Sequence, residues 1–164
     1  MSAPSPSTGS TGASAAVLKI GGLDLAFRQS DIRALESASD MDGNAPLERS
    51  VGWIAYMRQR WPVYCLSEQL DVLDSVPPAR RTCALLAFEA GYFGLLCDDA
   101  AILRQAAGQL HEVPPAMKHA NTPILGLLPD GEHLLCLSNP GRMAAYLEHR
   151  TRRQSLPEEL PCLP

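Results

Sequence analysis

The most informative part of the sequence for the fold is Val51-Gly-Trp-Ile-Ala-Tyr-Met-Arg-Gln-Arg-Trp-Pro-Val-Tyr-Cys-Leu66. It holds two runs rich in aromatic and β-branched residues, which favour strands, and a short polar segment, residues 57–60, between them. We therefore predict a β-hairpin with residues 57–60 at its tip. Gly52 would let the backbone bend or let another strand approach closely. Pro62 lacks a backbone N–H, which predicts that the second run lies at a sheet edge or at the start of strand pairing.

The tip of this hairpin combines cations with aromatic rings. Arg58 and Arg60 lie between Trp53 and Trp61, a composition that protein–protein hot spots favour. Met57, Arg58, Arg60 and Trp61 are therefore the candidate partner-binding residues, and a solvated tip is the alternative for the two arginines. Each tryptophan is either an interface anchor or a core residue. The two-residue period of a strand favours the core for Trp53 and leaves both alternatives open for Trp61.

Composition and charge narrow the function classes. The chain has 164 residues and is 46% hydrophobic, which is typical of one folded globular domain. Its formal net charge is −4, so no overall basic field would hold nucleic acid or an anionic membrane. Because no apolar run reaches the roughly 20 residues that cross a bilayer, we expect no membrane insertion. The first residues show no charged segment followed by an apolar one, so we expect a cytoplasmic protein without a secretory signal.

The five cysteines are interpreted as buried thiols in a reducing compartment rather than as disulfides or metal ligands. Their number is odd, their spacing is wide, and three of them lie inside apolar runs. They are Cys65, Cys83, Cys97, Cys136 and Cys162.

No catalytic constellation is present in the sequence. It has no G-x-S-x-G, G-x-x-x-x-G-K or H-E-x-x-H motif, and its four histidines are scattered without metal-ligand spacing. Asp98 and Asp99 would disfavour the thiolate of neighbouring Cys97, the opposite of an activated nucleophile. The two aspartates form either a paired-carboxylate site or, as we expect, a solvated turn. We therefore predict a protein that is not an enzyme and has no cofactor or metal.

Three further hairpins are predicted on either side of the central one. Residues 17–20 and 23–27 flank Gly21-Gly22, which tolerates the positive φ of a two-residue hairpin turn. Residues 82–97 turn back near Gly91, and residues 123–137 turn back near Gly131. Residues 100–103 are predicted to form a further short strand, with a helical turn as the alternative because the segment is rich in alanine. Strands at this spacing predict a small antiparallel barrel or a sandwich.

Helices and tails complete the prediction. We expect a helical turn over residues 32–35 after Ser30 and Asp31, a short helix over residues 68–73 capped by Ser67, and a helix over residues 140–147 capped by Asn139. Residues 36–47 are predicted to be a loop. The domain is expected to span residues 17–147, between a flexible tail of residues 1–16 and a loosely ordered tail of residues 148–164.

From about residue 17 to residue 147 the chain resembles the CheW-like domain family. The resemblance rests on the order and spacing of several segments. They are the opening hairpin over residues 18–27, Ser30-Asp-Ile32, Gly52-Trp-Ile54, Trp61-Pro62-Val63 with Leu66, Phe93-Gly-Leu-Leu-Cys-Asp98, residues 110–114, Pro123-Ile-Leu-Gly126 and residues 134–137.

The resemblance implies a mainly β fold: two small five-stranded SH3-like barrels side by side with a few short helices. It implies no catalysis and no cofactor. It also implies a non-catalytic adaptor that couples chemoreceptor cytoplasmic tips to a CheA-type histidine kinase, in chemotaxis or in pilus-type (type IV pili) motility. Such an adaptor would be cytoplasmic, including at receptor arrays at the cell pole.

Departures from the family pattern fall on the central stretch. Where the family usually has Asn-Leu-Arg-Gly at the tip, this chain has Ala55-Tyr-Met-Arg58, and Cys65 replaces an aspartate. Met57 thus takes the place of the family's arginine, and Arg58 follows it. These departures favour a divergent member. Two alternatives remain. One is a CheW-like scaffold repurposed for an unrelated partner, and the other is a small enzyme, which no sequence motif supports.

Overall fold

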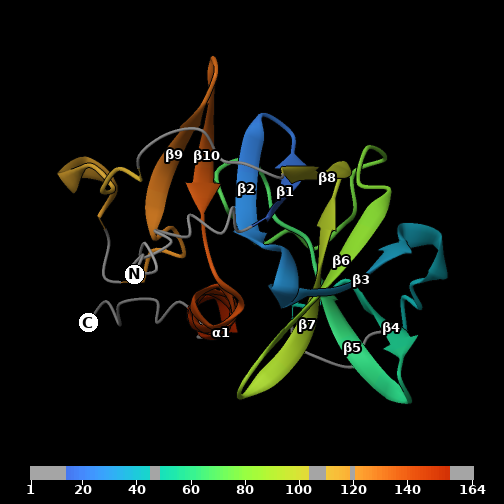
Figure 1. Ribbon diagram of the computed structural model, residues 1–164. Coiled ribbons are helices and arrows are strands. Elements are labelled where there is room, and N and C mark those ends of the chain that lie inside the picture. Colours follow the sequence, from blue (N-terminus) through green and yellow to red (C-terminus); the bar gives the residue numbers. More distant parts are fainter. Residues whose placement is uncertain (1–13, 45–48, 104–109, 119–120, 156–164) are drawn as a thin grey trace, which may run out of the picture.

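A computed structural model describes residues 14–44, 49–103, 110–118 and 121–155. Within these residues the chain forms ten strands, one α-helix and three 3-10 helices (Figure 1). The strands are β1 (Ala15–Ile20), β2 (Leu23–Arg28), β3 (Ile32–Ser37), β4 (Gly52–Tyr56), β5 (Gln59–Tyr64), β6 (Thr82–Phe88), β7 (Gly91–Cys97), β8 (Asp99–Leu103), β9 (Gly126–Asp130) and β10 (His133–Leu137). The helices are η1 (Gln29–Asp31), η2 (Ala38–Asp40), η3 (Pro115–Met117) and α1 (Pro140–Ser155).

The strands form two five-stranded sheets that lie side by side (Figure 1). We call the sheet β8-β1-β2-β10-β9 barrel A and the sheet β3-β6-β7-β5-β4 barrel B. An isolated bridge closes each sheet: Asp42 pairs with Trp53 in barrel B, and His111 pairs with Leu127 in barrel A. Gly52 makes the first closure possible, because a Cβ there would lie 2.4 Å from the carbonyl oxygen of Asp42. The predicted pair of small barrels is confirmed.

Both barrels arrange their strands in the same way. A central hairpin, β6–β7 or β1–β2, has an antiparallel strand on one side and a parallel strand on the other. Barrel B is continuous along the chain from β3 to β7. Barrel A combines β1 and β2 with β8, β9 and β10. One barrel is therefore inserted into the other.

The largest hydrophobic core is shared by the two barrels and α1. Leu25 and Phe27 of barrel A are fully buried in the same cluster as Leu86 and Leu95 of barrel B and Met143 of α1. A shared core of this kind holds the barrels together, because separating them would expose all of these side chains to water. A second cluster fills barrel B alone, and a third lies in barrel A.

A buried ion pair also joins the barrels. Arg80, whose side chain is 6% exposed, donates one bond to the carboxylate of Asp98 and another, of 3.1 Å, to the carbonyl oxygen of Leu66. The other carboxylate oxygen of Asp98 accepts from the backbone N–H of Gly21 in barrel A at 2.9 Å. The predicted solvated turn at Asp98 is therefore wrong, because this carboxylate is fully engaged between the two barrels.

The predicted hairpins are confirmed, and so is the start of the last helix. Gly21 has a φ of +60°, as a two-residue hairpin turn requires. The side chain of Asn139 accepts from the backbone N–H of Arg142 at 2.7 Å and caps α1. Pro62 lies just before Val63, where β5 starts to pair with β7, so its missing N–H leaves that ladder intact.

Two predicted helices are wrong. Residues 32–35 belong to strand β3, which pairs with β6, and only Gln29–Asp31 before it is helical. Residues 68–73 form a tight turn in which the Ser67 hydroxyl accepts from the N–H groups of Gln69 and Asp71. Ser67 does bond to backbone N–H groups, as predicted for a cap, but no helix follows it over residues 68–73. The bridge between Leu66 and Val72 brings the two ends of this segment together, so the chain forms a turn instead.

Regular structure continues past both ends of the expected domain, residues 17–147. Strand β1 begins at Ala15, because Ala15 and Ala16 pair with β2 and are buried. Helix α1 continues past residue 147 to Ser155, and Arg150 stacks on Tyr146 and pairs with Asp71. The predicted tails over residues 1–13 and 156–164 lie outside the described residues.

Candidate protein-binding site

Two hairpin turns lie at one end of barrel B. The β4–β5 turn consists of Met57 and Arg58, and the β6–β7 turn consists of Glu89 and Ala90. They share this end because β5 and β7 pair in parallel and both start here. The sequence predicted each turn separately, but only the parallel pairing places them side by side.

The β4–β5 turn, formed by Met57 and Arg58, is conformationally strained. Met57 has a φ of 50° and Arg58 a φ of 63°, the values of a two-residue turn that normally takes Asn-Gly. Each non-glycine residue in this left-handed region costs roughly 1–2 kcal/mol. Met57 is also 76% exposed. The turn therefore combines backbone strain with a large apolar side chain that is exposed to solvent. This combination is associated with functional loops.

Trp61 is a core residue on the inner face of barrel B. It is 4% exposed and packs with Ile54 and Val63. Its indole N–H donates to the carbonyl oxygen of Tyr56 at 3.1 Å, and its ring centroid lies 4.7 Å from that of Tyr92. Of the two alternatives for Trp61, the structure shows that it is a core residue. It would therefore contribute to partner binding mainly by holding the β4–β5 turn in place.

Trp53 lies on the outer face, and its predicted place in the core is wrong. Alternation along β4 and β5 turns Ile54 and Trp61 inward and Trp53 and Arg60 outward. The guanidinium carbon of Arg60 lies 4.6 Å from the Trp53 ring centroid, which is a cation–π contact. Trp53 thus forms, with Arg60, a rigid aromatic and cationic feature outside the barrel.

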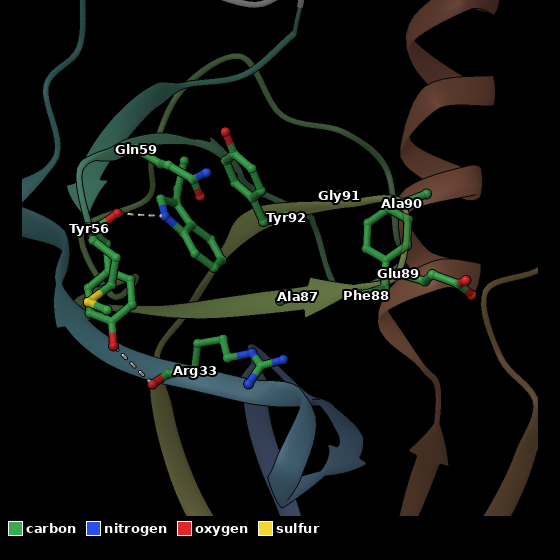
Figure 2. Close-up of a pocket in the computed structure, with 11 residues that line it drawn as sticks. Arg33, Tyr56, Gln59, Ala87, Phe88, Glu89, Ala90, Gly91 and Tyr92 are labelled. Carbon is green, nitrogen blue, oxygen red and sulfur yellow. Dashed lines mark hydrogen bonds between the residues drawn. The ribbon is translucent and has the colours of Figure 1, made fainter.

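An open concavity of about 670 Å³ lies between the two turns. Figure 2 shows Tyr56 on one side, Phe88 and Ala90 on the other, and Arg33 below them. Trp61 and Tyr92 contribute aromatic surface to its lining. The concavity therefore combines an aromatic surface with polar groups at its rim, as protein and ligand sites do.

A second concavity of about 920 Å³ lies on the other side of the β6–β7 turn. It is formed between the two barrels, by the end of β6, the end of β10 and the start of α1. Its apolar lining includes Phe88, Leu125, Leu137 and Pro140. Its charged lining residues are Arg28, Asp31 and Glu89. The β6–β7 turn thus separates two hollows.

Of the predicted site residues, Met57, Arg58 and Arg60 are exposed and Trp61 is buried. Their binding role stays a prediction. The concavity adds residues that sequence reasoning missed, above all Arg33, Phe88 and Tyr92. No local signal could have found them, because β3, β6 and β7 reach the β4–β5 turn only through pairing between distant segments.

The described cysteines are poor nucleophiles. Cys65, Cys83, Cys97 and Cys136 are free and buried, as predicted, and Cys162 lies outside the described residues. Burial, helped by the charges of Asp98 and Asp99, raises the pKa of Cys97 to about 12. Burial also raises the pKa of Cys65, Cys83 and Cys136.

No group of three or more potential metal-ligating side chains occurs within the described residues. No helix in the described part of the chain is long and apolar enough to cross a membrane.

Thiol labelling tests this environment. In a Cys162→Ser background at pH 8, the four remaining thiols should react with a maleimide or disulfide reagent about a hundredfold or more slowly in the native state than in urea. The reason is that reagents attack the thiolate, and burial both blocks access and keeps these thiols protonated. Native rates equal to those of the unfolded chain would contradict the buried placement.

Comparisons with known proteins support the fold. No protein-family model matches the sequence, and no curated protein matches it. Among solved structures, the chain is similar to the scaffolding protein TtCheW from Thermoanaerobacter tengcongensis, with a TM-score of 0.63. The match has 11% sequence identity and covers 77% of this chain and 88% of that one. The chain therefore has a CheW-like fold that has diverged far in sequence.

Proposed function

We propose that this protein is a non-catalytic adaptor of a bacterial chemosensory system. It would couple receptor cytoplasmic tips to a CheA-type histidine kinase by protein–protein contacts, for chemotaxis or for pilus-type motility. One observation carries the proposal: on a CheW-like fold, an exposed and strained turn with Met57 and Arg58 borders an aromatic concavity. A cytoplasmic location, at receptor arrays or elsewhere, follows from the proposed partners.

Two separate hollows suit an adaptor, which has to hold two partners at once. One lies beside the β4–β5 turn, and the other lies between the barrels. The residues at the first include tryptophan, tyrosine, methionine and arginine, types that are enriched where proteins bind one another. Arg58 and Arg60 would contribute orientation and association rate more than affinity.

A second candidate is a CheW-like scaffold that binds an unrelated partner. It is favoured by Met57, which stands in the turn where the family pattern has arginine. Cys65, where the family pattern has an aspartate, also departs from that pattern and is fully buried in barrel B. The partner recovered in the following experiment distinguishes the two candidates.

Charge reversal at the turn tests the proposal. We expect the wild-type protein to bring down a CheA-type kinase or a receptor from the native host. Arg58→Glu combined with Arg60→Glu should reduce recovery at least about tenfold, since like charges then face the partner. The measurement is a quantitative pull-down, after circular dichroism has shown that both proteins fold.

Arg81→Glu is the control for charge reversal away from the turn. It reverses the same charge at an exposed residue next to the start of β6, at the opposite end of barrel B. Equal losses for both variants would mean that the turn is not the contact. Recovery of an unrelated protein by the wild type would favour the second candidate, and absence of any kinase or receptor would refute the adaptor proposal.

A further inference from the structure

Two of the three arginines at this end of barrel B, Arg33 and Arg58, have no ion-pair partner among the described residues. The third, Arg60, stacks on Trp53. Glu89 is the acidic residue that lines the concavity. Arg33 lines the concavity and Arg58 belongs to the turn that borders it, so with Glu89 they give the concavity and its turn a formal charge of +1, although the whole chain carries −4. Such a local reversal of sign favours an acidic partner.

The aromatic lining is held rigidly. The indole N–H of Trp61 is bonded to Tyr56, and the Trp61 ring contacts the rings of Tyr56 and Tyr92 at centroid distances of 5.6 Å and 4.7 Å. Phe88, at the end of β6, lies on the opposite side of the concavity from Tyr56 (Figure 2). A preformed apolar surface of this kind accepts a side chain without having to reorganise.

We propose that the concavity accepts an apolar side chain carried on an acidic segment of a partner protein. The apolar side chain would enter between Tyr56 and Phe88, and flanking carboxylates would pair with Arg33 and Arg58. The inference rests on the proposed function, because it names the kind of segment that a partner would offer to this site. The strained turn fits it, since Asn-Gly would fold with less strain but would remove both Met57 and the Arg58 charge.

The two tryptophans provide a direct measurement. The chain has only Trp53 and Trp61, so a ¹H–¹⁵N spectrum of the full chain shows two indole signals, which Trp53→Phe assigns. The probe is the peptide Glu-Glu-Leu-Glu-Phe-Glu-Glu. We expect it to shift the Trp61 signal in a saturable way and to leave that of Trp53, whose N–H bonds to Asn44 on the outer face, unchanged.

Control peptides separate the two chemical requirements. Replacing Leu and Phe of the probe by Ser should remove the Trp61 shift, because nothing then fills the concavity. Replacing its Glu residues by Lys should weaken binding at least about tenfold, because of repulsion by the arginines. Equal binding of all three peptides would overturn the proposal.

Protein variants locate the contacts. Arg33→Glu should weaken binding of the acidic probe at least about fivefold, and Arg81→Glu should leave it unchanged. The double variant Met57→Asn, Arg58→Gly should lose binding while its thermal midpoint stays the same or rises. If that variant binds the probe as well as the wild type, the turn is not part of the site.

Other outcomes distinguish this inference from the proposed function. If the Trp61 signal shifts with protein concentration alone, a second copy of the chain occupies the concavity and the inference is overturned. If the acidic probe leaves Trp61 unaffected while the wild type still recovers a kinase or receptor, the adaptor proposal stands and this inference fails.

Discussion

Replacing Arg80 by methionine is expected to lower the free energy of unfolding by about 3–5 kcal/mol, as loss of one partner of a buried ion pair does. The Arg80 side chain is 6% exposed, and it neutralises Asp98 where the two barrels meet. The Asp98 side chain is 25% exposed. Without Arg80, the hydrogen bond from the Gly21 N–H is the one that its carboxylate keeps among those the structure describes. Urea unfolding, followed by tryptophan fluorescence, measures the loss.

A double-mutant cycle provides the control. Asp98→Asn alone should also destabilise, because it leaves the Arg80 guanidinium buried without a counter-charge. The double variant Arg80→Met, Asp98→Asn should then be more stable than the sum of the single losses predicts, because it leaves no unpaired charge. Additive losses would show that the two side chains act independently and would contradict their assignment as a coupled pair.

Trp61→Ala is expected to cost about 3–5 kcal/mol of folding free energy. The ring is 4% exposed, contacts Tyr56 and Tyr92, and fills the core of barrel B, so its removal leaves a cavity. The same urea titration gives the value. The change should not be used to test partner binding, since it would disturb the aromatic surface and the β4–β5 turn together.

Trp53→Ala is the matched control for Trp61→Ala. It should cost only about 1–2 kcal/mol, because its ring is partly exposed and the cation–π contact with Arg60 is worth about 0.5–1 kcal/mol. Equal costs for the two variants, or a larger cost for Trp53→Ala, would reverse the assignment of inner and outer faces on β4 and β5.

The orientation of the tryptophans shows where sequence reasoning stopped. The hairpin itself was predictable, because aromatic and β-branched runs flank a short polar turn. Which face points inward was not, because Trp53 and Trp61 are both large and both have apolar neighbours at the two-residue period. A strand's register relative to its barrel decides that choice, and shifting it by one residue would exchange the faces.

The candidate site was predictable in the same partial way. Met57, Arg58 and Arg60 could be selected as an exposed tip from composition alone, and the structure does place them at the surface. Arg33, Phe88 and Tyr92 could not be selected, because each is an ordinary residue of its own strand or turn. They become part of a site only where β3, β6 and β7 meet the start of β5.

The local elements could be predicted from the sequence alone: the hairpins at Gly21, at Met57, at Glu89 and at Gly131, and the cap of α1 at Asn139. These depend on turn chemistry, alternation and capping, which act between residues a few positions apart. The pairing of β5 with β7, and the contacts by which Arg80 and Asp98 hold Gly21 against barrel B, became visible only in the three-dimensional structure. Gly21 and Asp98 lie 77 positions apart. Contacts at such separations depend on how whole elements pack, so no short segment carries a signal for them.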